Sequence, residues 1–183
     1  PIGAFYWHRN IVEFECLDGV EIVGGEAFYE CPSLRRVKMP GVKTIEESAF
    51  DDCYALADVE CDKLERIGGW AFSGCESLRS IILPSVKVVE AYEFYCCTGL
   101  TEVKFGDKLE SIGGQAFGNC PSLERIAIPL NHRIIAADDI FTECRNLKHV
   151  DLVGGVLETI AALHLEDWRN DMNAAIDDIN QIL

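Results

Sequence analysis

The sequence lacks the features that mark several common functional classes. No stretch reaches the roughly 18 uncharged apolar residues of a membrane-spanning helix, so we expect no direct membrane insertion. Basic residues are scarce, with 16 Lys and Arg against 31 Asp and Glu, and the net charge of −15 argues against a nucleic-acid partner. The four histidines are scattered, C-x-x-C is absent, and the glycine pairs lack the Lys of a phosphate-binding loop. We therefore assign no catalytic residue, metal site or cofactor and expect no enzyme.

The sequence does contain an internal repeat, marked by phenylalanine at intervals of 22 to 24 residues. The column comprises Phe5, Phe28, Phe50, Phe72, Phe94, Phe117 and Phe141. Cysteine follows three residues after six of these phenylalanines, and His8 takes its place in the first unit. Further apolar columns complete a unit of the form I-G-x-x-A-F-x-x-C-x-x-L-x-x-V-x-L-P. Units of this length bury their apolar columns only by stacking, which predicts a solenoid.

Each unit combines two periodicities, and together they predict the fold class. Phe28, Cys31 and Leu34 are spaced three apart, which is typical of one turn of α or 3₁₀ helix. Val37 and Met39 alternate with charged residues, as in a short strand with one buried face. We therefore expect an α/β solenoid with one short parallel strand and one short helical turn per repeat.

The two ends of the chain depart from the repeat. Residues 1–153 are expected to form one domain of seven turns, the first truncated, because the chain begins inside a unit and without Met. This beginning suggests a fragment or a processed product. Gly154 and Gly155 interrupt the pattern, and apolar residues then recur with a period of 3.6, which predicts an amphipathic helix within 154–183. We expect this helix to cap turn seven, with an oligomer contact as the alternative.

One unit, Ile67 to Pro84, has the sequence IGGWAFSGCESLRSIILP. This unit and its copies in register over residues 2–153 resemble the leucine-rich repeats of the BspA-like type. The resemblance implies a right-handed leucine-rich-repeat array with the cysteine on a convex turn. It further implies a binding module without catalysis, of a kind found in bacterial and protist surface and interaction proteins.

The nine cysteines follow the repeat and do not form a metal-binding motif. Six lie in the helical column, Cys16 and Cys61 lie in the strand column, and only Cys96 lies outside both. We expect buried, free thiols, with some disulfide bridging or a metal as alternatives. Free thiols weakly favour an intracellular location, whereas the family resemblance makes the cell surface the alternative.

The outward positions of the predicted strands form the first candidate binding surface. They hold seven basic and seven acidic residues, so the remainder of the chain carries the whole net charge of −15. We expect a protein ligand, or alternatively a glycan, on this concave face. The candidate residues are Arg35, Arg36, Lys38, Asp58, Glu60, Arg79, Lys104 and Arg125. An electropositive centre at Arg35, Arg36, Lys38 and Arg79 is one interpretation, and charge pairing between neighbouring turns is the other.

Aromatic residues flank the Phe column and form a second candidate surface. Tyr6 and Tyr29 share one column, and Trp70 and Tyr92 share another. Stacked aromatics either anchor a partner or cover the thin convex wall. The alternative function is therefore a structural or assembly subunit that joins a larger complex through this convex surface and the acidic C-terminal helix.

One position breaks the repeat chemically. Glu93 replaces the usual Ala before the Phe, which puts a carboxyl group at a position expected to be buried. A locally rotated turn and a functional acid are the two explanations.

Overall fold

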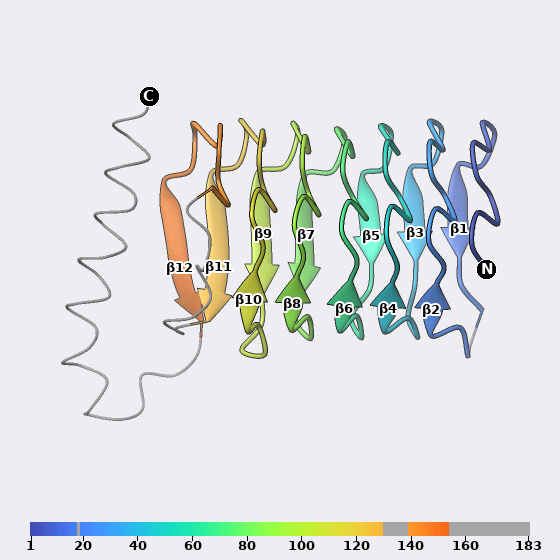
Figure 1. Cartoon of the computed structure of the whole chain (residues 1–183), viewed down its shortest axis with the longest axis horizontal. Helices are drawn as coiled ribbons and strands as arrows, with labels where there is room; N and C mark the ends of the chain where they lie inside the picture. Colours follow the sequence, from blue (N-terminus) through green and yellow to red (C-terminus); the bar gives the residue numbers. More distant parts are fainter. Residues whose placement is uncertain (18, 130–138, 154–183) are drawn as a thin grey trace. The chain divides into compact units, whose positions relative to one another are not determined.

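The computed structural model describes residues 1–17, 19–129 and 139–153. The chain separates into two compact units, Pro1–Val153 and Gly154–Leu183. The predicted C-terminal helix and its role as a cap lie outside the described residues. The first unit is a solenoid of parallel strands (Figure 1).

The strand predicted after each leucine column is present and forms the first ladder. Its members are β1 (Glu13–Glu15), β3 (Arg36–Lys38), β5 (Asp58–Glu60), β7 (Ser80–Leu83), β9 (Glu102–Phe105), β11 (Arg125–Pro129) and β12 (His149–Val153). All pairings are parallel, and equivalent residues of successive repeats stand opposite one another, as Val37 does between Phe14 and Val59. The ladder consists of two sheets, β1-β3-β5 and β7-β9-β11-β12, with an interruption between β5 and β7 (Figure 1).

The prediction of one strand per turn is wrong, because five turns carry a second strand. These strands are β2 (Ile22–Val23), β4 (Thr44–Ile45), β6 (Arg66–Ile67), β8 (Val88–Val89) and β10 (Ser111–Ile112), and they form one continuous parallel sheet. Each ends in a buried Val or Ile of the column that precedes the Phe by five residues. Two residues are too few to show an alternating pattern, so the sequence signal was a single apolar column.

The predicted helical turns are also wrong, because the described residues contain no helix. Glu26 and Glu30 have φ angles of 55° and 50°, in the left-handed region that interrupts a right-handed helix. Between them, the Phe28 N–H donates to the carbonyl of Ala49 in the next turn at 2.8 Å, whereas the Tyr29 N–H donates back to Glu26 at 3.1 Å. Alternate amides thus bond to the neighbouring turn. Consecutive tight turns therefore produce the three-residue spacing that a helix would also give.

The core consists of columns that run along the solenoid. Neighbouring rings of the Phe column lie 5.0 to 5.7 Å apart and nearly parallel. Beside them, each cysteine of the repeat donates its thiol to the Phe carbonyl of the preceding turn, as in Cys53 to Phe28 at 3.0 Å and Cys97 to Phe72 at 3.1 Å. The prediction of buried, free thiols is confirmed for eight of the nine cysteines, and Cys96 is half-buried. Cysteine suits this column because it is small and apolar and still donates a hydrogen bond.

Candidate functional site

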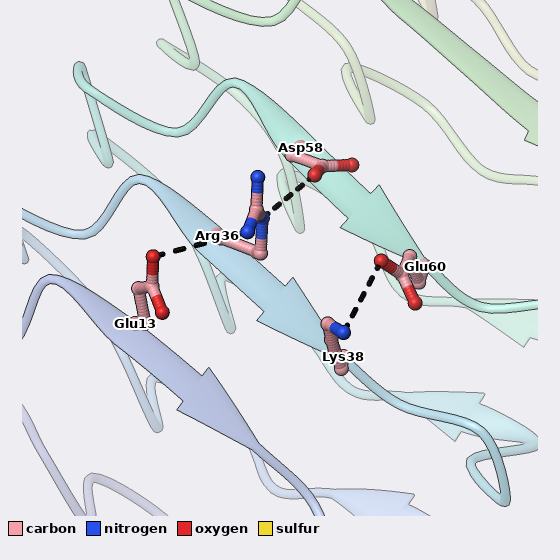
Figure 2. A network of polar contacts seen from close by, with 5 residues as sticks. All are labelled: Glu13, Arg36, Lys38, Asp58 and Glu60. Atoms are coloured by element: carbon pink, nitrogen blue, oxygen red, sulfur yellow. Dashed lines mark hydrogen bonds and ion pairs between the residues drawn. The ribbon is translucent and has the colours of Figure 1, made fainter.

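The outward side chains of the first ladder, together with the residue before each strand, form a surface that we call the strand face. On β3, Arg36 lies between acids of both neighbouring strands, with its Nε 2.8 Å from Asp58 and its Nη1 3.9 Å from Glu13. The Lys38 Nζ lies 3.7 Å from Glu60 (Figure 2). The parallel register produces these pairs, because it places Glu13, Arg36 and Asp58 in one row.

Some of the remaining candidate residues of the strand face are also paired with acids. Lys104 on β9 pairs with Glu102 at 3.1 Å, and Arg125 on β11 pairs with Asp151 of β12 at 3.5 Å. Arg79, just before β7, donates from Nη1 to the carbonyl of Gly99 at 3.3 Å. The predicted residues thus lie on one surface, but the interruption between β5 and β7 separates Arg79 from the cluster on β3.

The basic cluster on β3 is therefore largely paired with acids. Arg35 precedes the strand, is exposed, and forms no ion pair within the described residues. Arg36 and Lys38 have side chains 46% and 40% exposed, so their ion pairs are solvated and worth about 0.2–1 kcal/mol each. Pairs of this strength restrain the side chains and exchange readily for the charges of a ligand.

A second row of charges was not predicted from the sequence. Residues directly before the strands of the second ladder alternate in sign from turn to turn, as Glu21, Lys43, Glu65, Lys87 and Glu110. Lys43 pairs with Glu21 at 2.7 Å and Lys87 with Glu65 at 3.0 Å. The Lys87 ion pair lowers the pKa of Glu65. The alternation at the repeat period was the signal that could have revealed this row.

Both aromatic columns predicted from the sequence form stacked pairs. The rings of Tyr6 and Tyr29 lie 5.1 Å apart, and those of Trp70 and Tyr92 lie 4.4 Å apart at an angle of 8°. Tyr95 adds an edge-on contact to Trp70 at 5.9 Å and to Tyr92 at 5.7 Å. Trp70, Tyr92 and Tyr95 therefore form a cluster, and Trp70 is still 37% exposed.

A groove of about 660 Å³ lies beside this cluster. Three successive turns contribute to its wall. Two do so through β4 and β6 and the residues that follow these strands, and the third only through the residues that follow β8. The side chains that give it chemical character are those of Glu46, Glu47, Arg66, Trp70, Glu90 and Tyr92. Gly68 and Gly69 form part of the wall, and a Cβ on Gly68 would approach the Glu47 nitrogen to 2.6 Å. The two glycines therefore allow adjacent turns to pack closely at the wall of the groove.

The buried carboxyl group of Glu93 lies next to the groove residues in the sequence. It is fully buried, its Oε2 accepts the Glu90 N–H at 2.9 Å, and its Oε1 has no hydrogen-bond partner within the described residues. Burial raises the pKa of Glu93 well above its usual value, and the Glu90 N–H opposes this rise in part. The neutral carboxyl group is thus the form that this position favours.

Burial makes thiols of the repeat core poor nucleophiles. Burial raises the pKa of Cys61 to about 12 and that of Cys53 further, which keeps these thiols protonated and poorly nucleophilic. Within the described ranges, no group of three or more His, Cys, Asp or Glu side chains is arranged to hold a metal ion. The same ranges contain no helix that is both long and apolar enough to span a bilayer.

Comparison with known proteins identifies the repeat. The family model described as BspA type leucine-rich repeat region matches residues 1–87 and 67–166, with six copies. A leucine-rich repeat protein of T. pallidum has a solved structure that is 33% identical over 77% of this chain and 69% of that chain, with a TM-score of 0.69. No curated protein matches the chain.

More distant solved structures share the fold. A leucine-rich repeat protein from Bacteroides ovatus is 26% identical, with a TM-score of 0.59, over 76% of this chain and 42% of that chain. One from Eubacterium ventriosum is 22% identical, with a TM-score of 0.64, over 74% of this chain and 37% of that chain. The chain therefore spans less than half the length of these two proteins.

Proposed function

Because the chain belongs to the BspA-type leucine-rich repeat family, we propose that it is a non-enzymatic scaffold that binds a protein ligand on its strand face. A repeat scaffold offers a long, regular surface without needing a catalytic pocket. The proposal holds inside or outside the cell, because burial shields eight of the nine free thiols from oxidants, and a reducing compartment leaves thiols unchanged.

The observation that supports the strand face is its fixed rows of charge. Arg36 and Lys38 are held by acids on adjacent parallel strands, at spacings set by the backbone. Side chains that are already restrained lose less conformational entropy when a ligand binds. A protein surface with its own alternating charges would exchange these weak pairs for pairs across the interface.

We expect Arg35 to attract an acidic group of the ligand. It projects beside the paired row, and no carboxylate of the described residues lies within ion-pair distance. Arg36 and Lys38 then add charge once their acidic neighbours are displaced. Arg79 extends the basic surface along the solenoid, with its guanidinium tied to the Gly99 carbonyl.

The test uses a ligand identified by cross-linking mass spectrometry and measures its association rate. Reversal of Arg35, Arg36 and Lys38 to Glu should slow association with an acidic ligand about tenfold at low salt, with a smaller effect as salt rises. The matched control replaces Lys43, Lys63 and Lys87 by Glu. This variant has the same change in net charge, at exposed positions away from the strand face.

Equal slowing by the test and control variants would show that only net charge matters and would refute a specific role for the strand face. Unchanged binding by the test variant, with binding lost when Trp70 and Tyr92 are replaced by Ala, would assign recognition to the aromatic columns instead. A ligand that proves to be a glycan would replace the protein ligand of the proposal.

A further inference from the structure

The backbone at Trp70 and Tyr92 is unfavourable for residues of their size. Their φ angles are 64° and 60°, in the left-handed region that bulky side chains rarely adopt. The same position of neighbouring turns also has positive φ but carries Glu26, Ser48 and Gln115. The turn itself therefore requires no aromatic residue. An aromatic residue kept at a position where smaller residues serve in neighbouring turns is consistent with a role beyond the turn.

Among the described residues, no other aromatic ring stacks on the second face of the indole. Successive turns place Ser48 and Tyr92 on opposite sides of Trp70 in this column, and the Ser48 N–H donates to Gly69 at 3.1 Å. Tyr92 covers one face of the indole at 4.4 Å. The hydroxymethyl group of Ser48 is too short to cover the other face. Glu46 and Glu47 of the Ser48 turn line the groove together with Trp70. The Glu46 Oε2 accepts the Gly25 N–H at 2.9 Å, and its second oxygen stays available to a cation.

The charges around the groove are those that a cation would require. Glu46, Glu47 and Glu90 are exposed carboxylates of its lining, and Arg66 is the one basic residue there, so the lining carries a net charge of −2. Carboxylates beside an aromatic face attract ammonium and guanidinium groups by direct charge and by the cation–π interaction. An anion would meet three carboxylates at the same place.

The buried Glu93 side chain holds the backbone of Glu90, one of these carboxylate residues. In neighbouring turns the corresponding amide donates to the preceding strand, as Gly68 does to Ile45 and Gly113 to Val89, both at 2.8 Å. In this turn the Glu90 N–H instead bonds to the buried Glu93 carboxyl group at 2.9 Å. The substitution of Glu for Ala at residue 93 thus acts on the backbone of a groove residue, and Glu93 is a positioning residue.

We propose that this groove is a second binding site, which takes an arginine or lysine side chain from an extended segment of a protein partner. The cation would lie between the open indole face of Trp70 and the carboxylates of Glu46 and Glu47. The groove volume of about 660 Å³ exceeds that of one side chain, so residues flanking the cation also fit. This inference rests on the proposed protein-binding function but concerns a different surface.

The experiment uses short glycine-flanked peptides with a central Arg, Lys or citrulline, titrated into the full chain by calorimetry. Citrulline matches Arg in shape but is neutral. We expect saturable binding of the Arg and Lys peptides and about tenfold weaker binding of the citrulline peptide. The variant Trp70→Ser with Tyr92→Gln introduces the residue types found at positions 48 and 115 of the same column. Ser48 and Gln115 adopt the same positive φ, so we expect the variant to fold. It should lose about tenfold in affinity.

Two further variants keep the test specific. Glu47→Gln removes one charge without touching the aromatic stack and should weaken the charged peptides but not the citrulline peptide. Tyr6→Ser with Tyr29→Ser removes the other aromatic pair and should leave peptide affinity unchanged. Equal binding of the Arg and citrulline peptides, undiminished binding by the Trp70 and Tyr92 variant, or no binding up to about 1 mM would each overturn the proposal. The variant of Arg35, Arg36 and Lys38 tests the strand face with its own ligand, so failure of one site is distinguishable from failure of the other.

Discussion

At the scale of single residues, Glu93 shows most clearly how one substitution in a repeat makes the stability of the fold depend on pH. Four other turns hold a buried alanine in the same column, at residues 27, 49, 71 and 116, and the last turn holds the buried Ile140. Burial raises the pKa of the Glu93 carboxyl group well above its unfolded value. The folded state therefore binds a proton that the unfolded state releases, and stability falls as pH rises from the ordinary Glu pKa toward the raised one.

We predict that Glu93→Gln is more stable than the parent by about 1–3 kcal/mol at pH 8, because the amide keeps the acceptor for Glu90 and carries no buried charge. The advantage should disappear toward about pH 3, where the carboxyl group is neutral in both states. Urea denaturation at a series of pH values measures this difference. Glu90→Gln, at an exposed neighbour, should show no comparable pH dependence. A stability difference that is constant with pH would contradict the buried-charge explanation.

At the scale of elements, the sequence predicted the columns better than the local backbone. Phe28 and Cys31 were placed correctly in the core, because a buried column repeats at the period of the solenoid. The helical turns were predicted wrongly, because consecutive tight turns share the three-residue spacing of a helix and left-handed residues such as Glu26 leave no distinct mark. The ion pairs of Arg36 could be foreseen as one of two interpretations. The groove could not, because it depends on side chains from three turns.

The interruption of the first ladder between β5 and β7 gives a prediction at this same scale. The amides of Thr101 and Glu102 donate to Arg79 at 2.8 and 3.3 Å, but no corresponding bonds join Arg79 and Ser80 to Ala57 within the described residues. Native-state hydrogen exchange should therefore be about tenfold or more faster at Arg79 and Ser80 than at Thr101 and Glu102. Equal protection at the two positions would show that the first ladder is continuous in solution.

At the scale of the whole molecule, charge is distributed very unevenly. The net charge is −15, with 31 acidic residues. Ion pairs among the described residues engage only eight different acidic side chains. Most carboxylates of the described residues therefore contribute repulsion that no close cation offsets. The strand face and the alternating row before the second ladder are regions where the repeat period places opposite charges side by side.

We predict that salt stabilises the protein, because screening weakens the many repulsions more than the few exposed ion pairs. The melting temperature should rise by about 2–4 °C between roughly 20 and 200 mM NaCl, which corresponds to about 1 kcal/mol for a chain of this size. Reversing Lys43, Lys63 and Lys87 to Glu changes the charge by two units at each position, from −15 to −21, and should steepen the dependence. Calorimetric melting of both proteins, repeated in KCl, separates screening from ion-specific effects. A melting temperature that falls with salt would mean that the rows of ion pairs outweigh the net repulsion, and the strand face would then be a source of stability as well as a binding surface.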